Sequence, residues 1–240
     1  MHMNVGFLGL GKLGLPVALA TESKGHSVFG YDISEKTIKN IKNRVIDYKE
    51  IWVEDYLPNS KIEILDIENL VKKSDIIFVP IQTPHHEKYE GVTRIPKERA
   101  DFDYSFLKNG VKTLSDEIEK QKKDKVVIII STVLPGTITR EIKPLLGKYT
   151  KLVYNPFFIA MGSTMKDFLH PEFVLFGRDD ELALKVGKEF YKTISSAPIY
   201  DTTIENAELI KVSYNTMIST KISFTNTLME MCYHLPNTDV

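Results

Sequence analysis

The stretch NVGFLGLGKLG, residues 4–14, determines the expected fold because an apolar run ends in three glycines spaced G-x-G-x-x-G. The run NVGFLG has the composition of a buried strand, and the segment 11–25 carries small and apolar residues at helical spacing. Glycines at such a junction allow the tight turn that joins a strand to a helix. The sequence therefore predicts a strand, a sharp turn and a helix within its first 25 residues.

Strand-like and helix-like segments continue to alternate beyond this unit. The apolar runs that we expect to form further strands are SVFGYD (27–32), DIIFVPI (75–81), VVIIIS (126–131), KLVYN (151–155) and FVLFG (173–177). Near-continuous apolar runs are typical of parallel strands covered on both faces, and crossover helices connect such strands. We therefore predict an α/β fold with a doubly wound, mostly parallel Rossmann-like sheet.

Two segments depart from this alternation. Residues 83–103 form an irregular stretch longer than an ordinary connection, which predicts a functional or mobile loop. The stretch 204–235 has apolar residues at three- and four-residue steps and no strong breaker, which predicts one long helix. A helix of this length needs a partner surface, either a second domain or a second subunit.

The composition excludes several classes of protein. The 31 basic and 32 acidic residues leave a formal net charge of −1, so nucleic acid and anionic membranes are not expected partners. The single cysteine, Cys232, excludes an internal disulfide framework and fits a reducing compartment. The longest apolar run, VVIIISTVLP, is too short to span a bilayer, and no secretory leader pattern is present. We expect a soluble, cytoplasmic protein without a metal site.

The three glycines and Asp32 together match a dinucleotide-binding fingerprint. Gly9 allows the tight turn, Gly11 lets the backbone approach a pyrophosphate, and Gly14 lets helix and strand pack closely. Asp32 lies about 20 residues further on, at the end of the second predicted strand, where a carboxylate accepts hydrogen bonds from ribose hydroxyls. Such a carboxylate repels a 2′-phosphate, so the pattern favours NAD over NADP. The alternative interpretation is a packing cluster of glycines beside a solvated aspartate.

Polar residues follow two of the apolar strands. Thr83 and Thr132 lie just past the carboxyl ends of their strands, at the edge where open α/β sheets bind ligands. Both could face the nicotinamide half of a dinucleotide, although their types also suit ordinary turns. On the long predicted helix, Lys211 and Asn215 are four residues apart and share a face, with Glu208 nearby. Lys211 is either a snorkelling surface residue or an amine held in a cleft, where burial lowers its pKa.

The loop YNPFFIAMG, residues 154–162, is apolar apart from Asn155 and follows a predicted strand. A loop of this composition is either internal packing or the wall of a pocket. Because it lies at the end of a strand, where ligands bind in this class of fold, we interpret it as a pocket wall.

In order and spacing, these segments resemble the UDP-glucose/GDP-mannose 6-dehydrogenase family over essentially the whole chain. The stretches that carry the resemblance are GFLGLGKLGLP, FVPIQTP, STVLPGT, YNPFFIAMG with KDFLHPEFVLFG, and NAELIKVSYN with TKISFTN. Members of this family oxidise the C6 alcohol of a UDP- or GDP-sugar to the uronate in two NAD-dependent steps of polysaccharide precursor biosynthesis. The resemblance implies an NAD-binding Rossmann-like domain in residues 1–200 and the start of a central helical domain in residues 201–240. It also implies a homodimer formed through the helix 204–235.

The resemblance assigns roles to individual residues. It implies a catalytic role for Lys211, Asn215 and Thr132, in which the lysine steadies the negative charge that develops on the reacting oxygen. The residues implied to contact or border NAD are Gly9, Gly11, Lys12, Leu13, Gly14, Asp32, Thr83, Pro84, Ser131 and Thr132. The residues implied to contact the nucleotide sugar are Asn155, Phe157, Phe158, Ile159, Met161, Lys211 and Asn215.

Several positions depart from the family pattern. The family loop usually reads N-P-E-F-L-x-E-G, whereas this chain has Phe157 and Met161 in place of the two glutamates, and neither can act as a general base. Phe173 stands where an arginine is common, and Thr225 where a glutamate is common. The nucleophilic cysteine of the family lies in a motif beyond the end of this sequence, and we interpret Cys232 as a packed thiol. We therefore expect the chain to bind NAD without completing the four-electron oxidation of UDP-glucose.

Two other functions are compatible with the sequence. One is a 3-hydroxyacid dehydrogenase of the related two-domain type, in which Lys211 is the acid/base for a single hydride transfer. It needs neither loop glutamates nor a nucleophilic cysteine, although the STVLPGT and NPFF segments favour the nucleotide-sugar enzymes. The other is a non-catalytic NAD-binding or interaction module that has lost its acidic loop residues.

Overall fold

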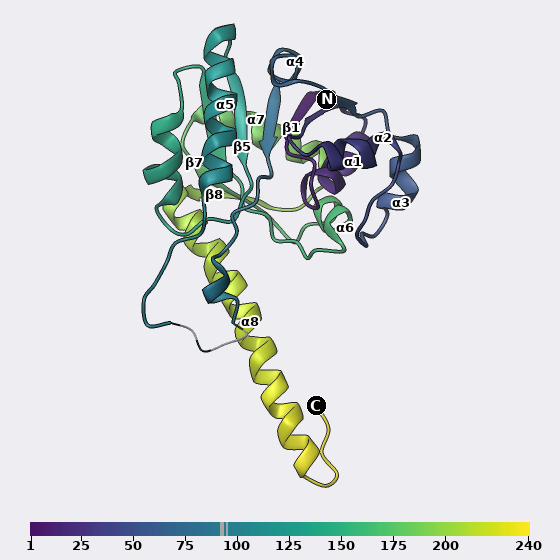
Figure 1. The fold of residues 1–240 in the computed structure, drawn as a ribbon, viewed down its shortest axis with the longest axis vertical. Coiled ribbons are helices and arrows are strands. Elements are labelled where there is room, and N and C mark those ends of the chain that lie inside the picture. Colours follow the sequence, from purple (N-terminus) through teal and green to yellow (C-terminus); the bar gives the residue numbers. More distant parts are fainter. Residues whose placement is uncertain (92–93, 95) are drawn as a thin grey trace.

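The computed structural model describes residues 1–91, 94 and 96–240, and it shows a sheet with helices on both faces and one helix that projects from it (Figure 1). Within these residues, eight strands form one sheet in the order β3-β2-β1-β4-β5-β6-β7-β8. The strands are β1 (Asn4–Leu8), β2 (Ser27–Tyr31), β3 (Glu63–Ile64), β4 (Ile76–Val79), β5 (Lys125–Ile129), β6 (Thr150–Tyr154), β7 (Val174–Arg178) and β8 (Ile199–Thr203). Neighbouring strands are parallel except for β6 and β7, which are antiparallel. The predicted doubly wound, mostly parallel sheet is confirmed.

Helices cover both faces of the sheet. The α-helices are α1 (Gly14–Ser23), α2 (Glu35–Lys42), α3 (Val53–Tyr56), α4 (Ile67–Lys73), α5 (Ser105–Gln121), α6 (Thr164–Leu169), α7 (Glu181–Ile194) and α8 (Ile204–His234). Short helical turns are η1 (Leu57–Asn59), η2 (Glu87–Tyr89), the π-helical η3 (Ile138–Ile142) and η4 (Lys143–Leu145). Apolar residues of α1, α6 and α7 join one buried cluster, and those of α4, α5 and η3 join a second.

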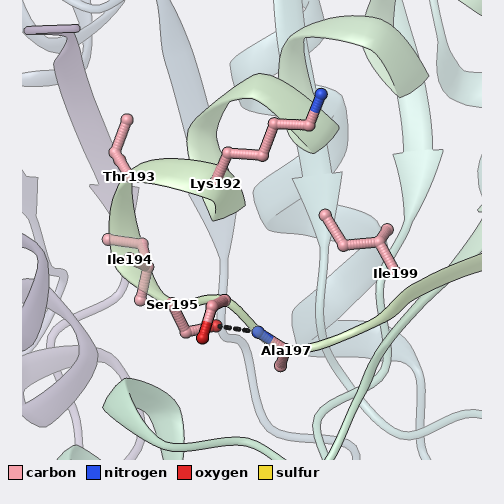
Figure 2. A pocket seen from close by; sticks show the side chains of 7 residues that line it. Lys192, Thr193, Ile194, Ser195, Ala197 and Ile199 are labelled. Atoms are coloured by element: carbon pink, nitrogen blue, oxygen red, sulfur yellow. Dashed lines mark hydrogen bonds between the residues drawn. The ribbon is translucent and has the colours of Figure 1, made fainter.

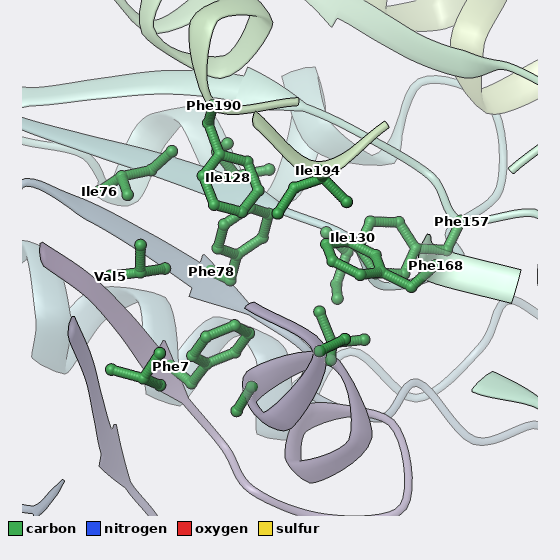
Figure 3. Packing of buried hydrophobic residues seen from close by; sticks show 14 of the residues in the cluster. Val5, Phe7, Ile76, Phe78, Ile128, Ile130, Phe157, Phe168, Phe190 and Ile194 are labelled. Carbon is green, nitrogen blue, oxygen red and sulfur yellow. The ribbon is translucent and has the colours of Figure 1, made fainter. Parts of the chain in front are cut away.

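The two clusters lie on opposite faces of the sheet because successive residues of a strand point to opposite sides. Phe7 of β1 belongs to the first cluster and its neighbour Leu8 to the second. In the first cluster the ring of Phe78 lies 5.4 Å from that of Phe7 and 5.2 Å from that of Phe190, so β1, β4 and α7 share one aromatic core (Figure 3). Each such ring contributes about 1.5–3 kcal/mol through burial. The strands near the centre of the sheet are therefore fixed from both sides.

The structure adds features that the sequence did not predict. β3 contains two residues and β8 reads IYDTT, so neither has the apolar run of a central strand. The predicted domain boundary after residue 200 lies within β8, and the division into domains stays a prediction. In the long segment 83–103 the structure has one helical turn, η2, while Val92, Thr93 and Ile95 lie outside the described residues.

The helix α8 is attached to the sheet only by its first turns. Its buried residues are Ile204, Ala207, Glu208 and Lys211. From residue 213 onward, every described residue of α8 except the partly buried Cys232 is exposed, and the helix extends away from the body (Figure 1). The attachment depends on Gly177 of β7, where an added Cβ would lie 2.8 Å from the Cα of Ile204.

None of the helices in the described part of the chain has both the length and the apolar character needed to cross a membrane.

Replacing Gly177 with alanine is expected to destabilise the fold by about 1–3 kcal/mol, because the new methyl group meets the backbone of α8 rather than a side chain that can move. The matched control is Gly187→Ala in α7, where the added Cβ meets the ring of Phe176 at 3.0 Å and alanine favours the helix. Urea denaturation of both variants tests this. Equal stability of Gly177→Ala and the wild type would contradict the close contact between β7 and α8.

Candidate functional site

The chain order of the strands reverses between β1 and β4, which are neighbours in the sheet. From β1 the chain proceeds to β2 and β3 on one side, whereas from β4 it proceeds to β5 and β6 on the other. In open parallel sheets, the carboxyl ends of two such strands form a crevice where ligands bind. The loops that follow β1, β4 and β5 therefore meet at this edge.

The glycine turn after β1 has the geometry that its spacing predicts. Gly9 has a φ of +118°, which favours glycine, and its amide donates a hydrogen bond of 2.8 Å to the carbonyl of Tyr31. A Cβ on Gly14 would lie 2.1 Å from the carbonyl oxygen of Gly9, so only glycine allows α1 to start this close to β1. The turn therefore places the amino end of α1 directly over the edge of the sheet.

The same turn fits a bound pyrophosphate. A Cβ on Gly11 would meet no atom within 4 Å, so the backbone is open to an approaching ligand at this position. α1 begins without a side-chain cap and without an acidic residue in its first turn, which leaves its partial positive charge available to an anion. Lys12 is exposed at this turn, and Leu13 packs on the first apolar cluster. These are the features that the diphosphate of NAD requires.

Asp32 follows β2 and lies beside the glycine turn. One carboxylate oxygen accepts a 2.7 Å hydrogen bond from the amide of Leu10, and the other accepts a 2.8 Å bond from the amide of Ser34. The hydroxyl of Ser34 caps α2 by accepting a bond from the amide of Thr37. Asp32 is therefore fixed next to the turn, and its contact with the adenosine ribose stays a prediction.

The loops after β4 and β5 are joined by two hydroxyl groups. Thr83 donates a 2.6 Å hydrogen bond to the carbonyl of Thr132, and Ser131 donates one of 2.5 Å to the carbonyl of Ile81. The carbonyl of Pro84 accepts a bond from the amide of Asp103, which holds the start of the long irregular segment. The structure therefore brings Thr83 next to Ser131 and Thr132, although Thr132 lies 49 residues further along the chain.

Lys211 is buried on α8, with a relative exposure of 6%. Its Nζ donates a 2.9 Å hydrogen bond to Oδ1 of Asn215 and lies 5.1 Å from the ring centroid of Phe158. Burial lowers its pKa from the ordinary value to about 8. Lys211 and Asn215 share a helix face as predicted, and the amine is buried rather than extended to the surface. An ammonium held in this way can stabilise negative charge on a nearby oxygen.

The loop 154–162 is part packing and part surface. The side-chain amide of Asn155 forms two hydrogen bonds inside the protein. Its Nδ2 donates to the carbonyl of Leu175, and its Oδ1 accepts from the hydroxyl of Tyr191. The ring of Phe157 is buried and lies 5.5 Å from that of Phe168 in the first cluster (Figure 3). The side chains of Asn155 and Phe157 thus point into the protein, although both residues line a hollow beside this loop together with Phe158. Their contact with a nucleotide sugar stays a prediction.

The other side chains of this loop have different surroundings. Phe158 is half-buried and lies against Phe173 and Tyr214, at centroid distances of 4.7 and 5.0 Å, while it also faces Lys211. Ile159 packs at the edge of the first cluster, and Met161 is 61% exposed. Phe158 is therefore the side chain of this loop that lies beside Lys211, and the contact of the loop with a nucleotide sugar stays a prediction.

A separate surface hollow lies at the end of α7 (Figure 2). Its lining residues are Lys192, Thr193, Ile194, Ser195, Ser196, Ala197 and Ile199. It contains none of the predicted site residues and no acidic side chain, so we assign it no part in the site.

Comparison with known proteins identifies a family and several relatives that this chain resembles. A family model described as the UDP-glucose/GDP-mannose dehydrogenase family, NAD binding domain, matches residues 3–195. The UDP-glucose 6-dehydrogenase of Bacillus subtilis is 28% identical over 238 residues, which cover 95% of this chain and 48% of that protein. The GDP-mannose 6-dehydrogenase of Pseudomonas aeruginosa is 27% identical over 237 residues, which cover 93% of this chain and 52% of that protein.

Solved structures share the fold of this chain. A ternary complex of GDP-mannose dehydrogenase from Pseudomonas aeruginosa matches with a TM-score of 0.85 and 25% identity, covering 96% of this chain and 53% of that one. The UDP-glucose dehydrogenase of Pyrobaculum islandicum matches with a TM-score of 0.83 at 24% identity, over 97% of this chain and 53% of that one. The chain thus spans about half the length of these relatives.

Alanine at two of the glycines is expected to separate NAD binding from stability. Gly11→Ala leaves the thermal melting of the chain unchanged without NAD, because the new methyl group meets no atom, but it weakens NAD binding by about tenfold or more where the diphosphate must approach. Gly14→Ala instead lowers stability by about 1–3 kcal/mol. Melting curves and calorimetric NAD titration check both, and unaltered NAD affinity in Gly11→Ala would contradict the assigned turn.

Proposed function

The chain belongs to the UDP-glucose/GDP-mannose dehydrogenase family and carries its NAD-binding domain, and on that premise we propose that it serves the NAD-dependent oxidation of the C6 alcohol of a UDP- or GDP-sugar. The observation that carries the proposal is the buried Lys211, paired with Asn215 and held beside Phe158 of the loop 154–162. Thr132 joins this proposal as a residue of the nicotinamide side, since it lies at the same carboxyl edge as the glycine turn.

When bound, NAD supplies the hydride acceptor. The glycine turn and the amino end of α1 would hold its diphosphate, and Asp32 would hold its adenosine ribose. On the substrate side, the ammonium of Lys211 would stabilise the alkoxide that forms when the C6 hydroxyl releases its proton to water. The C6–hydrogen bond would then break with its electron pair going to the hydride acceptor, and the alkoxide would become an aldehyde. Asn215 accepts a hydrogen bond from that ammonium and so keeps it in one orientation. The apolar surroundings strengthen the interaction, because they exclude water from the charged pair.

We also propose that a second copy of the chain covers the projecting part of α8. The large apolar side chains exposed between residues 217 and 231 are Met217, Ile218, Ile222, Phe224, Leu228, Met229 and Met231. Apolar residues gathered on an exposed helix are typical of an interface between proteins. Two such helices packed together would bury these side chains and give the homodimer that the sequence predicts.

A second candidate, a 3-hydroxyacid dehydrogenase, is favoured by one observation: the loop beside Lys211 offers no carboxylate at positions 157 and 161. In that reaction Lys211 must be neutral to accept the proton of the hydroxyl group, whereas in the proposed reaction it must be charged. The two functions therefore need opposite protonation states of one amine.

The rate of NADH formation as a function of pH is expected to distinguish the two functions. Because the pKa of Lys211 is lowered to about 8, the charged form is lost as the pH rises through that value. Oxidation of UDP-glucose or GDP-mannose should therefore fall above about pH 8, and Lys211→Met should lower the rate by about 10²-fold or more with NAD affinity unchanged. Turnover of a 3-hydroxyacid at a rate that rises through the same pH would favour the second candidate, and an active Lys211→Met variant would contradict both.

Restoring the two family glutamates should have unequal effects on stability. Met161→Glu is expected to stay within about 0.5 kcal/mol of the wild type, because the side chain is 61% exposed. Phe157→Glu is expected to lose about 3 kcal/mol or more, because it removes a buried ring and places a carboxylate in the first cluster. Urea denaturation measures both, and equal stability of the two variants would show that the ring of Phe157 does not belong to the core.

A further inference from the structure

The position of Lys211 is set by the residues that precede it on α8. Ile204 and Ala207 belong to the second apolar cluster, and Ile204 meets Gly177 of β7 backbone to backbone. Lys211 is the last buried residue of the helix, which leaves the body within one turn of it (Figure 1). The amine therefore lies at the end of the attached segment of α8, residues 204–211. Any rotation or displacement of this segment moves the amine.

Glu208 lies within this segment and is fully buried. Its Oε2 accepts a 2.5 Å hydrogen bond from the amide of Gly136, and its Oε1 accepts one of 2.8 Å from the amide of Ile138. These amides belong to the start of η3, a helical turn that has no cap from the side chain of Thr137 at its own N-cap position. One carboxylate thus satisfies two backbone donors that the turn itself leaves open.

Of the two amides that Glu208 binds, that of Gly136 belongs to the loop that carries Thr132, and that of Ile138 follows directly after this loop as the first residue of η3. That loop, STVLPGT (131–137), begins with the residues that hydrogen-bond to the loop after β4. Glu208 therefore connects α8 to the nicotinamide side of the crevice. Because Lys211 lies three residues further along the same helix face, a single side chain fixes the distance between Lys211 and this loop.

The charge of a buried glutamate contributes little net stability at this position. A buried carboxylate loses its hydration, and its hydrogen bonds return little more than that loss. An apolar residue of similar volume would avoid the loss of hydration but would leave the amides of Gly136 and Ile138 without this partner. What a carboxylate adds is direction, since both of its oxygens accept bonds from amides at defined positions.

We propose that Glu208 is a positioning residue, which holds Lys211 and Thr132 in a fixed relation by joining α8 to the loop 131–137. The inference rests on the proposed function of those two residues. Glu208 itself touches neither NAD nor substrate in this proposal, and its effect on the reaction passes through the position of the lysine.

The experiment compares Glu208→Gln with a matched control, Glu205→Gln. Glu205 lies one turn earlier on α8 and is exposed. It accepts a 2.8 Å hydrogen bond from the hydroxyl of Thr139, which belongs to η3. Both substitutions remove one charge from α8 and keep its shape. Only Glu208→Gln places an amide nitrogen against one of the backbone donors that the carboxylate accepted.

The readout is the pKa of Lys211, measured by NMR from the pH dependence of its Cε resonance. This resonance is assigned by comparison with the Lys211→Arg variant. We expect a midpoint of about 8 in the wild type and in Glu205→Gln. In Glu208→Gln we expect it to rise by about one pH unit or more toward the ordinary value, because the loosened segment lets water reach the amine. A folded Glu208→Gln variant with an unchanged midpoint would overturn the proposal.

A measurement on the wild type covers the case in which Glu208→Gln does not fold. If one carboxylate joins the two elements, the amides of Gly136 and Ile138 must open together with those of residues 208–211, with one common free energy in native-state hydrogen exchange. Exchange of the helix amides while Gly136 and Ile138 stay protected would overturn the proposal. Neither readout needs NAD or a nucleotide sugar, so a failure of the proposed function would appear separately, as absent NADH formation in the unaltered chain.

Discussion

The close approach of α1 to the end of β1 is the constraint on which the rest of the site depends. A Cβ at Gly14 would lie 2.1 Å from the carbonyl oxygen of Gly9, and Gly9 itself has a φ of +118°. With glycine at both positions, the helix starts directly over the sheet edge and directs its amino end into the crevice between β1 and β4. A side chain at Gly14 would lift the helix away from the loops that Thr83 and Ser131 hold together.

The second half of the site depends on a much weaker attachment. The first turns of α8 are buried against β7 and η3, whereas the rest of its 31 residues extends beyond the sheet. An isolated helix gains little stability in water, so a long exposed helix is stabilised mainly by whatever packs against its apolar side chains. The fold thus joins a rigid cofactor crevice to an arm whose base carries Lys211. Contacts at that base, such as those of Glu208 and Gly177, determine how well the arm keeps the amine in place.

Sequence patterns predicted the central sheet because its strands are apolar on both faces, as in VVIIIS and DIIFVPI. They missed β3 and β8, whose residues are partly polar and whose pairing depends on a neighbouring strand. They also could not show that β7 runs antiparallel to β6, because periodicity carries no direction. The fold class therefore followed from composition along the chain, while strand direction and the edge strands β3 and β8 followed from tertiary contacts.

The glycine turn was predictable because its function needs a fixed local spacing, and Lys211 because the resemblance singled it out. The partners of Glu208 were not, since Gly136 lies 72 residues away in the sequence. Nor could the loop pattern decide which of two adjacent phenylalanines faces the core. In the structure Phe157 packs on Phe168 in the first cluster, whereas Phe158 packs against the second cluster and faces Lys211.

Lys211 shows why these details affect chemistry. Its closest polar partner is the neutral amide of Asn215, and none of the ion pairs in the described part of the chain includes it. A neighbouring carboxylate would favour the charged amine and raise its pKa, whereas burial beside Phe158 lowers it to about 8. The amine therefore changes charge close to neutral pH. In such surroundings an oxygen that becomes negative would be the nearest counter-charge, so the interaction would strengthen as the reaction proceeds rather than before it.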